Sequence, residues 1–568
     1  MPVSAAPSSG KYAVPAEIRA LKPKNVSCLV KKIDDGYYVY EHLRVDDPKH
    51  PGKKKNATGR YLGVISDMKF HPAEGFSVED TQGFISDISE EVPDLLEYGA
   101  YALPVSVSES VLERLQTVYS YDDATRIYVI ALIYFVNHYT PARDLQECFR
   151  QSYLSKLYTR VSLSENAAGR FLEDLGSHAE KRLRFEQSLI RDGSGNYNID
   201  GHVILCCSKY NDLAAYGSHY PELGSTQANF MMIFDAGNKR VISCNAFDGG
   251  IPDKAAVKDT LDSHEFRSAR FRVDSGFYSE ENMALFRENE CSFVVPVPGT
   301  TVLKKTALKH IRFEKSFVHR RKGDNGKTEY SSVQYQEFTV QQLEDLAEQD
   351  AVEEAERRNS ENEGKTDKDG KPLKKVYPKK IARSSFQKDR VIVYRDQLMY
   401  DRLVFDYRKT IGDGTHTEEK FAELEPQFGI ILLRTNDLKK TAEQLYCEYK
   451  DRWQIETYYD YLANGIDCKA LHSSNYYVQQ GIGFLIMIEG LIYSEVFRHI
   501  EKSEKPYIRN MSIDECILTS RRLKTCRYPD NTWHVNQVRG EITKLFDYFG
   551  LDISADMQRL NLRTKVGC

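Results

Sequence analysis

The sequence has few of the features that mark secreted, membrane-spanning or zinc-binding proteins. Its 11 cysteines are scattered without any CxxC pair, and an odd number argues against a disulfide framework. The first ten residues are small and polar and contain no apolar signal core. We therefore expect a cytoplasmic, nucleoid-associated protein in a reducing environment, without structural zinc.

Long hydrophobic runs are also scarce. The longest, Gly481 to Tyr493, is interrupted by Glu489 and is too short to span a bilayer. The run predicts a buried helix, and no membrane partner is expected.

A strong excess of one charge is absent as well, since the formal net charge is −5. The distribution is uneven, however. Residues 22–60 hold ten Lys and Arg against five acids, 302–327 hold nine against two, and 365–390 hold ten against three. Residues 341–363 are acidic, with nine acids against two bases. Local basic patches can bind DNA in a net-acidic protein, because affinity depends on how many phosphates are neutralised. Each run could equally be a solvated face or a linker.

The chain has 568 residues, too many for one ordinary core, and its composition is that of a globular protein. Six segments are predicted: an N-terminal β module that contacts DNA (1–100), a helical DNA-binding or linking domain (101–195), the first part of a catalytic core (196–300), an insertion with basic segments and a charged linker (301–425), the second part of the core (426–504) and a C-terminal helical region (505–568).

The catalytic core is predicted from alternating strand and helix patterns. Residues 197–205 form a strand pattern, and 230–234 with 241–247 flank an Asp-Ala-Gly-Asn turn and predict a hairpin. Phe271 to Asp274 is a short strand, after which Ser279 is a cap residue followed by two acids. These patterns predict a mixed α/β sheet.

The most informative motif is Tyr449-Lys-Asp-Arg452-Trp-Gln-Ile-Glu456, which follows the apolar run 428–435. It is predicted to begin a long helix. Positions i, i+3 and i+7 share one helical face, so a tyrosine hydroxyl, a guanidinium and a carboxylate would project together. This set suits a phosphodiester held beside a divalent metal ion.

Three acids are predicted to bind metal: Asp200 on a strand, Asp274 at a strand end and Glu456 on the helix. Phosphodiester cleavage benefits from two ions roughly 4 Å apart, and Mg²⁺, with Mn²⁺ as a substitute, prefers carboxylates and water. Asp212 and Asp235 are rival first acids. With 83 acids in the chain, the triad alone is not specific.

The motifs that surround the three acids make the prediction of a metal-binding triad specific. The run Gly429-Ile-Ile-Leu-Leu-Arg-Thr-Asn436, the Tyr-x-x-Arg-x-x-x-Glu pattern, the turn Val273-Asp-Ser-Gly-Phe-Tyr-Ser-Glu-Glu-Asn282 and the stretch Asn245 to Asp253 together resemble the insertion-sequence DDE transposases. Within them they resemble the IS-four-like branch, which has a tyrosine–arginine–glutamate–lysine signature and a β-rich insertion before its last catalytic residue.

This resemblance implies a ribonuclease-H-like catalytic core interrupted by a β-rich insertion. It implies that double-stranded DNA is cleaved at transposon ends and that the 3′-OH ends are joined to target DNA, with a homodimer holding two ends. By position, Asp200, Asp274 and Glu456 match the metal-binding triad, and Tyr449 and Arg452 match the pair that grips a terminal phosphate.

One position departs from the family pattern. The lysine expected seven residues after Glu456 is Ala463, and Lys469 is a candidate replacement. A missing phosphate contact would weaken end binding without abolishing metal chemistry. Further DNA contacts are predicted at four residues of the basic insertion: Lys304, Lys305, Arg320 and Arg321.

Alternatives remain at several levels. Arg452 could form a salt bridge with Glu456, Trp453 could pack in the core, and His202, two residues after Asp200, could be structural. The alternative functions are a catalytically silent DNA-binding protein of transposase descent and a stand-alone nuclease. Strand-joining products would separate a transposase from both.

Overall fold

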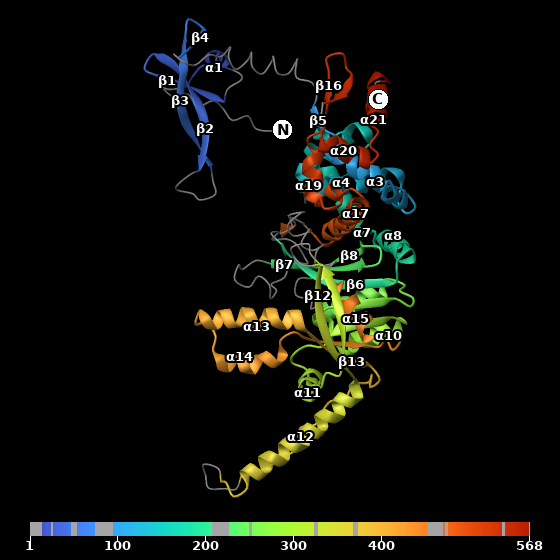
Figure 1. The fold of residues 1–568 in the computed structure, drawn as a ribbon. Coiled ribbons are helices and arrows are strands. Elements are labelled where there is room, and N and C mark those ends of the chain that lie inside the picture. Colours follow the sequence, from blue (N-terminus) through green and yellow to red (C-terminus); the bar gives the residue numbers. More distant parts are fainter. Residues whose placement is uncertain are drawn as a thin grey trace. The chain divides into compact units, whose positions relative to one another are not determined.

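The computed structural model describes residues 14–23, 27–46, 54–73, 95–206, 226–248, 253–322, 328–366, 373–452, 470–471, 475–536 and 540–566 (Figure 1). The chain divides into two compact units. One comprises residues 1–94 with 527–532, and the other residues 95–526 with 533–568. This division lies six residues before the predicted boundary at residue 100.

The N-terminal unit is a small antiparallel sheet with one short helix. Its elements are α1 (Ala16–Ala20), β1 (Cys28–Ile33), β2 (Gly36–Asp46), β3 (Lys54–Ser66) and β4 (Lys69–Pro72), and the strands lie in the order β1-β2-β3-β4. Apolar residues at alternate positions of the strands and on α1 form its core. These strands lie within the expected N-terminal β module, whose contact with DNA stays a prediction.

The larger unit is built around a ten-stranded mixed sheet. Along the main path the order is β11-β12-β13-β14-β10-β9-β6-β7-β8, and β15 pairs with β6. The bounds are β6 (Asn196–Cys206), β7 (Thr226–Asp235), β8 (Arg240–Asp248), β9 (Arg270–Val273), β10 (Ser292–Pro296), β11 (Lys315–Lys322), β12 (Thr328–Thr339), β13 (Arg390–Asp396), β14 (Ile430–Thr435) and β15 (Ala470–Leu471). The expected strands and the β7–β8 hairpin are confirmed.

Parallel pairing is confined to the middle of this sheet. β6 pairs in parallel with both β9 and β15, and β9 pairs in parallel with β10. The strands of the 301–425 stretch, β11 to β13, continue the same sheet by antiparallel pairing onward from β14. The residues between the two halves of the core therefore extend the core's own sheet.

Helices complete the larger unit. They are α3 (Gly99–Gln116), α4 (Tyr121–Asn137), α5 (Ala142–Gln151), α6 (Leu154–Leu157), α7 (Glu165–Ser177), α8 (Ala179–Arg191), α9 (Asp253–Asp262), α10 (Glu280–Glu288), α11 (Val302–His310), α12 (Val340–Asn362), α13 (Gln397–Gly412), α14 (Glu418–Leu424), α15 (Ala442–Lys450), α17 (Tyr476–Glu501), α18 (Pro506–Arg509), α19 (Ile513–Ser520), α20 (Glu541–Tyr548) and α21 (Ile553–Val566), with short 3₁₀ turns at Ser275–Phe277 and Glu425–Gln427.

Helix α17 is the buried helix that the apolar run predicted, but it is longer than the run. The helix that contains the run has 26 residues and, by length and composition alone, is long and apolar enough to cross a membrane, so it is longer than the run indicated. Asn475 caps the helix a full turn and more before the apolar run. Most of the apolar window, 83%, is buried inside the protein, as in core helices of globular proteins.

Close packing fixes α17 against its neighbours. Gly176 of α7 and Gly481 of α17 face each other's helices, and a Cβ on Gly176 would lie 1.7 Å from the Tyr477 carbonyl oxygen. The Gln480 side chain exchanges hydrogen bonds with the Ala246 backbone of β8, at 2.7 and 3.3 Å. The described residues around α17 thus join the helices to the edge of the sheet.

The C-terminal region contains two strands as well as the expected helices. β16 (Lys524–Arg527) lies between β17 (Trp533–Val535) and β5 (Leu95–Glu97) in a three-stranded sheet. Apolar residues of this region belong to the same buried cluster as α3, α4 and α17. The helical prediction was therefore incomplete, because strands of three and four residues are too short to give a periodic signal.

Candidate active site

Asp200 and Asp274 lie side by side on neighbouring parallel strands. Ile199 of β6 is paired with Val273 of β9, so the next position on each strand carries an acid. Asp274 follows the end of β9 but keeps an extended backbone, with φ −79° and ψ 169°. Neighbouring strands are about 4.8 Å apart, and residues in register point to the same face. The two predicted acids therefore share one face at the centre of the sheet.

Helix α15 brings Tyr449 and Arg452 to the first acid. The Arg452 Nη1 atom is 3.5 Å from Oδ2 of Asp200, and the guanidinium carbon is 5.9 Å from the centre of the Tyr449 ring. The Arg452 and Asp200 side chains are 14% and 20% exposed. The expected grouping of tyrosine and arginine is confirmed, and a carboxylate of the predicted triad lies with them.

The expected helix start at Tyr449 was wrong. α15 begins at Ala442, where Thr441 and Gln444 form a reciprocal capping box, and Tyr449 lies in its last turn. Arg452 follows the helix end, and its N–H donates to the Tyr449 carbonyl at 3.1 Å. This i, i+3 bond preserves the side-by-side placement that the motif predicted.

Several predicted residues lie outside the described part of the chain. They are Glu456, Ala463, Lys469, Trp453 and Asp212, together with the side chain of His202. The described chain stops at Arg452, against Asp200, and resumes at β15, where Ala470 pairs with Leu205 of β6. Both ends of the stretch that contains Glu456 are therefore attached to the strand that carries Asp200.

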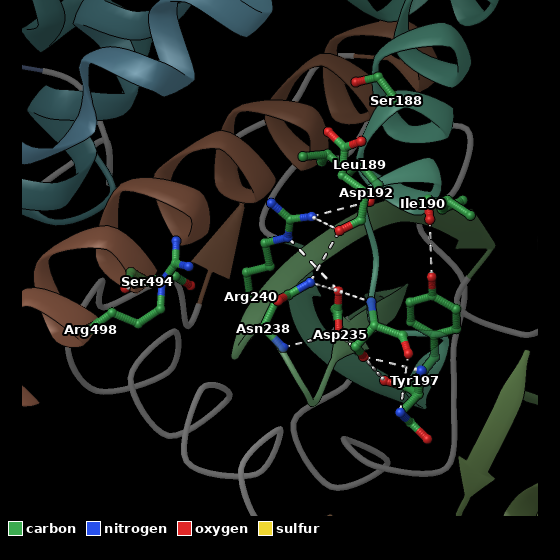
Figure 2. Close-up of polar contacts among 12 residues, drawn as sticks. Ser188, Leu189, Ile190, Asp192, Tyr197, Asp235, Asn238, Arg240, Ser494 and Arg498 are labelled. Carbon is green, nitrogen blue, oxygen red and sulfur yellow. Dashed lines mark hydrogen bonds and ion pairs between the residues drawn. The ribbon is translucent and has the colours of Figure 1, made fainter.

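The rival acid Asp235 has a structural role in the β7–β8 turn (Figure 2). Its carboxylate accepts hydrogen bonds from the backbone N–H groups of Ser194 and Asn238 and from both side chains. Arg240 lies 3.9 Å away, and the Asp235 side chain is completely buried. A carboxylate with these partners and no exposure is not available to an ion shared with DNA.

A buried arginine on β9 connects the strand of the second acid to α15. Arg272 Nη1 donates to the Glu448 carbonyl at 3.2 Å, near the helix C-terminus, where a cation is favoured. The residue is 4% exposed, and its Nε and Nη2 find no hydrogen-bond partner among the described residues. Burial lowers the pKa of Arg272 to about 10, and the charge of Asp451 opposes that shift.

A second buried arginine supports the turn that follows Asp274. Arg434 of β14 donates to the Tyr278 hydroxyl at 3.1 Å and to Oε1 of Glu280 at 2.7 Å. Its remaining donors reach Oδ2 of Asp389 at 2.9 Å and Oγ of Ser384 at 2.8 Å. Burial works against the charge, but these partners outweigh it and raise the pKa of Arg434. Arg434 thereby joins the Asp274 turn, β14 and the loop before β13.

The four basic residues of the insertion divide into two groups. Lys304 and Lys305 lie on α11; Lys305 is exposed, whereas Lys304 is half-buried and burial lowers its pKa. Arg320 is exposed on β11. Arg321 points to the other face, where it pairs with Glu329 at 3.0 Å.

Among the described residues, Arg321 is the member of this set whose charge acts on α15. Burial lowers the pKa of Lys450, in the last turn of α15, and the Arg321 charge adds to that shift against the opposing effect of Asp396. None of the four forms a hydrogen bond or ion pair with Asp200 or Asp274 in the described part of the chain, so their role in DNA binding stays a prediction.

The two described acids, Asp200 and Asp274, fit a hard divalent cation. Asp200 and Asp274 offer two carboxylates on rigid strands, which suits Mg²⁺. The Arg452 guanidinium beside Asp200 shows that this carboxylate can accommodate a cation. Among the described residues no group of three His, Cys, Asp or Glu side chains is arranged to hold an ion, and Glu456 lies outside them.

The sequence interpretation missed Arg272 and Arg434 as site residues. A signal for the first was present: Arg270 and Arg272 alternate with Phe271 and Val273 on a strand that is buried on both faces. Burying a charged residue at such a position costs free energy unless it is paired, so an arginine there points to a role at a site. Arg434 is the arginine of the Gly429–Asn436 motif, and the sequence did not indicate a role for it.

Comparison with known proteins supports a transposase. Residues 199–481, about half of the chain, match the family model described as "Transposase DDE domain". This range includes both described acids, Tyr449 and Arg452. The mixed sheet is consistent with the ribonuclease-H-like core of such a domain. No curated protein matches the chain at a significant level.

A solved structure titled "Cryo-EM structure of piggyBac transposase synaptic complex with hairpin DNA" is also similar. It is 10% identical, with 80% of this chain and 78% of that chain covered, and the TM-score is 0.32. A TM-score this low does not establish a common fold.

Proposed function

We propose that this protein is a DDE transposase of the IS-four-like branch that cleaves transposon ends and joins their 3′-OH groups to target DNA. The observation that carries the proposal is the register between β6 and β9, which sets Asp200 beside Asp274 within the matched range, with Arg452 against Asp200. A generic α/β domain has no need of two acids and a guanidinium at one position of its sheet.

The third metal ligand in this proposal is Glu456. It follows Arg452 by four residues, so a fully extended chain would carry it at most about 14 Å from Arg452. Asp200, Asp274 and Glu456 would hold two Mg²⁺ ions. Bound ions would activate the attacking oxygen and stabilise the leaving oxygen.

The chain's own residues would orient the DNA. Arg452 would exchange its contact with Asp200 for a phosphate oxygen, which a guanidinium can bind with two N–H groups. The Tyr449 hydroxyl would lie beside the same phosphate. Arg272 would hold the end of α15 over β9, so that the phosphate contacts and Asp274 keep a fixed separation. A homodimer would hold two transposon ends together.

The test is a cleavage and strand-joining assay on the DNA that flanks the gene, with Mg²⁺ or Mn²⁺. Wild type should cut at the ends and produce joined products. Asp274→Asn should lower both rates by at least a thousandfold, in the range of effects seen when one group of a catalytic unit is removed. Glu281→Gln is the matched control, because Glu281 is an exposed acid seven residues further along.

The possible outcomes separate the competing functions. Cutting without joined products would indicate a stand-alone nuclease. DNA binding without cutting by the wild type would indicate a silent DNA-binding protein, and replacing Ala463 by lysine would then be the next variant. Equal losses in Asp274→Asn and Glu281→Gln would remove the support for this site.

A further inference from the structure

Asp396, the last residue of β13, carries a buried carboxylate that three other elements share. Its Oδ2 atom accepts a hydrogen bond from the Tyr446 hydroxyl of α15 at 2.6 Å. Its Oδ1 atom accepts from the Ser331 hydroxyl of β12 and, at 3.2 Å, from the backbone N–H of Met399 in the first turn of α13. The residue is 2% exposed. One side chain therefore connects β12, α13 and α15.

The hydrogen bonds to Asp396 keep its carboxylate ionised. Burial works against the charge, but the bonds from Ser331, Tyr446 and the Met399 backbone outweigh it and lower the pKa of Asp396. Burial and the bond to Asp396 raise the pKa of Tyr446, so its hydroxyl keeps its proton and donates. A hydrogen bond to an ionised acceptor is stronger than one between neutral groups. The link between Asp396 and α15 is thus of the strong kind.

Helix capping alone does not explain this carboxylate. Asp396 is the N-cap of α13, but a cap needs a single oxygen, which serine, threonine or asparagine supplies without a charge. A buried charge costs free energy that a neutral cap avoids. The Ser331 hydroxyl oxygen already accepts from the backbone N–H of Leu398 at 3.1 Å. The second oxygen of Asp396, which Tyr446 occupies, is the part that serves α15.

Strand β11 contacts the same turn of α15. The His319 ring lies edge-on to the Tyr446 ring with the centres 5.2 Å apart, and the Phe317 ring lies 5.6 Å from it. The Cys447 Sγ atom is 3.5 Å from Nδ1 of His319. Burial lowers the pKa of His319. All three strands of the 301–425 stretch therefore contribute side chains that hold the turn of Tyr446 and Cys447.

This turn lies immediately before the site residues of α15. Tyr446 and Tyr449 are three residues apart and share one side of the helix, and Tyr449 packs against the buried cluster that contains Tyr446. The backbone N–H of Arg452 donates to the Tyr449 carbonyl, and its guanidinium meets Asp200 at 3.5 Å. The position of the Tyr446 hydroxyl therefore determines where Arg452 meets the acid.

A comparable hydrogen bond holds the other end of α15. The Tyr394 hydroxyl donates to the carbonyl oxygen of Ala442, the first residue of the helix, at 2.8 Å. Tyr394 and Tyr446 are both completely buried. The two tyrosines thus make one hydroxyl bond each to the anchoring of α15, at opposite ends of the helix.

We propose that Asp396 is a positioning residue: through Tyr446 it fixes the C-terminal end of α15, and with it Arg452, relative to the metal-binding acids. The inference rests on the proposed transposase function and assigns a role within it to the 301–425 stretch. Strands β11 to β13 form the frame that places the active-site helix from one side, as Arg272 does from the other.

The first test is hydrogen–deuterium exchange of the full-length protein, read by mass spectrometry. Tyr446→Phe removes one hydroxyl and keeps the ring, and Asp396→Asn keeps the shape and removes the charge. Both should speed exchange of residues 446–452 about fivefold, as expected for the loss of one hydrogen bond. Tyr394→Phe is the matched control, and its effect should be confined to the start of α15. Tyr446→Phe tests the proposal even if Asp396→Asn folds poorly.

The second test is single-turnover cleavage at saturating DNA. Tyr446→Phe should lower the rate about tenfold, because a small displacement of a positioning group is costly, while DNA affinity stays within about twofold of wild type. Tyr394→Phe should cleave within about twofold of wild type. In an Arg452→Gln background, Tyr446→Phe should have little further effect, because two residues that act through one contact are not additive.

Several results would overturn the proposal. One is wild-type exchange of residues 446–452 in both Tyr446→Phe and Asp396→Asn. Others are equal losses of cleavage in Tyr446→Phe and Tyr394→Phe, or a full additional loss from Tyr446→Phe in the Arg452→Gln background. If exchange changes as expected but wild type neither cleaves nor joins DNA, the proposed function fails and the anchoring of α15 by Asp396 stands. If wild type cleaves and joins while exchange is unchanged, only this inference fails.

Discussion

Arg434 and Arg272 lie on strands of the same sheet, and both are almost completely buried, yet their surroundings differ. Arg434 donates to four side chains, and its pKa is raised. Within the described part of the chain, Arg272 makes one hydrogen bond and its Nε and Nη2 have no partner, and its pKa is lowered to about 10.

This difference indicates that Arg434 stabilises the framework of the sheet, whereas Arg272 positions residues of the site. A buried charge with complete partners is part of the framework, and removing it leaves its acids uncompensated. A buried charge with few partners costs stability, so its retention indicates a use other than stability. For Arg272 that use is the attachment of α15, with Tyr449 and Arg452, to the strand of Asp274.

Replacing Arg434 should have the larger effect on stability. Arg434→Met would leave Glu280 without its ion-pair partner, Asp389 with Arg287 alone and Ser384 without one of its donors, so the free energy of unfolding should fall by about 3–5 kcal/mol. Urea unfolding followed by circular dichroism measures the change. Arg383→Met is the control, because Arg383 forms ion pairs with Asp345 and Glu348 at the surface, where such pairs contribute little. Equal losses in the two variants would contradict this account of Arg434.

Replacing Arg272 should instead affect DNA cleavage more than the stability of the fold. Arg272→Met removes an incompletely paired charge, so the free energy of unfolding should stay within about 1 kcal/mol of wild type or rise. Cleavage should fall about tenfold or more, since misplacement by a fraction of an ångström is costly. Unfolding curves and single-turnover cleavage rates measure the two effects. A loss of stability as large as that of Arg434→Met, with normal cleavage, would show that Arg272 is a framework residue.

His264 is a third buried cationic side chain, and unlike Arg434 and Arg272 it can lose its proton within the accessible pH range. Its Nε2 lies 2.6 Å from Oε2 of Glu186; burial opposes protonation, but the Glu186 hydrogen bond and charge outweigh it and raise the pKa of His264. A raised folded-state pKa contributes stability that is complete below the ordinary histidine pKa and is lost as pH rises through the folded value.

His264→Gln should therefore be less stable than wild type by about 1 kcal/mol at pH 5.5, and the difference should shrink toward pH 9. Thermal melting across this range measures it. A difference that grows with pH would mean that His264 is neutral in the folded protein.

Local patterns predicted much of the core. Strand-like runs and the Asp-Ala-Gly-Asn turn placed β6, β7 and β8, and Ser279 was identified as the cap that begins α10. The Tyr449–Arg452 spacing correctly predicted that the two side chains lie together, although they lie at the end of α15. The local signal for the true start of α15 is the capping box formed by Thr441 and Gln444, which lies between the apolar run and the motif.

Long-range register was beyond the sequence. No pattern near Asp200 or Asp274 predicts that Ile199 pairs with Val273. The choice between Asp200 and Asp235 depends on which carboxylate accepts the hydrogen bonds of the β7–β8 turn. The attachment of β11 to β13 to the core sheet depends likewise on the β13–β14 pairing. These features follow from tertiary contacts, which periodicity does not encode.

The central claim is that Asp200, Asp274 and Glu456 form one metal-binding centre, and Fe²⁺-mediated backbone cleavage tests it most directly. Fe²⁺ substituted for Mg²⁺ in the full-length protein, with ascorbate and peroxide, cuts the chain near the bound ion, and mass spectrometry locates the cuts. The account predicts cuts near all three acids, suppressed together by excess Mg²⁺ and by Asp274→Asn but not by Glu281→Gln. Cuts near Asp200 and Asp274 without any near Glu456, or cuts unaffected by Asp274→Asn, would contradict it.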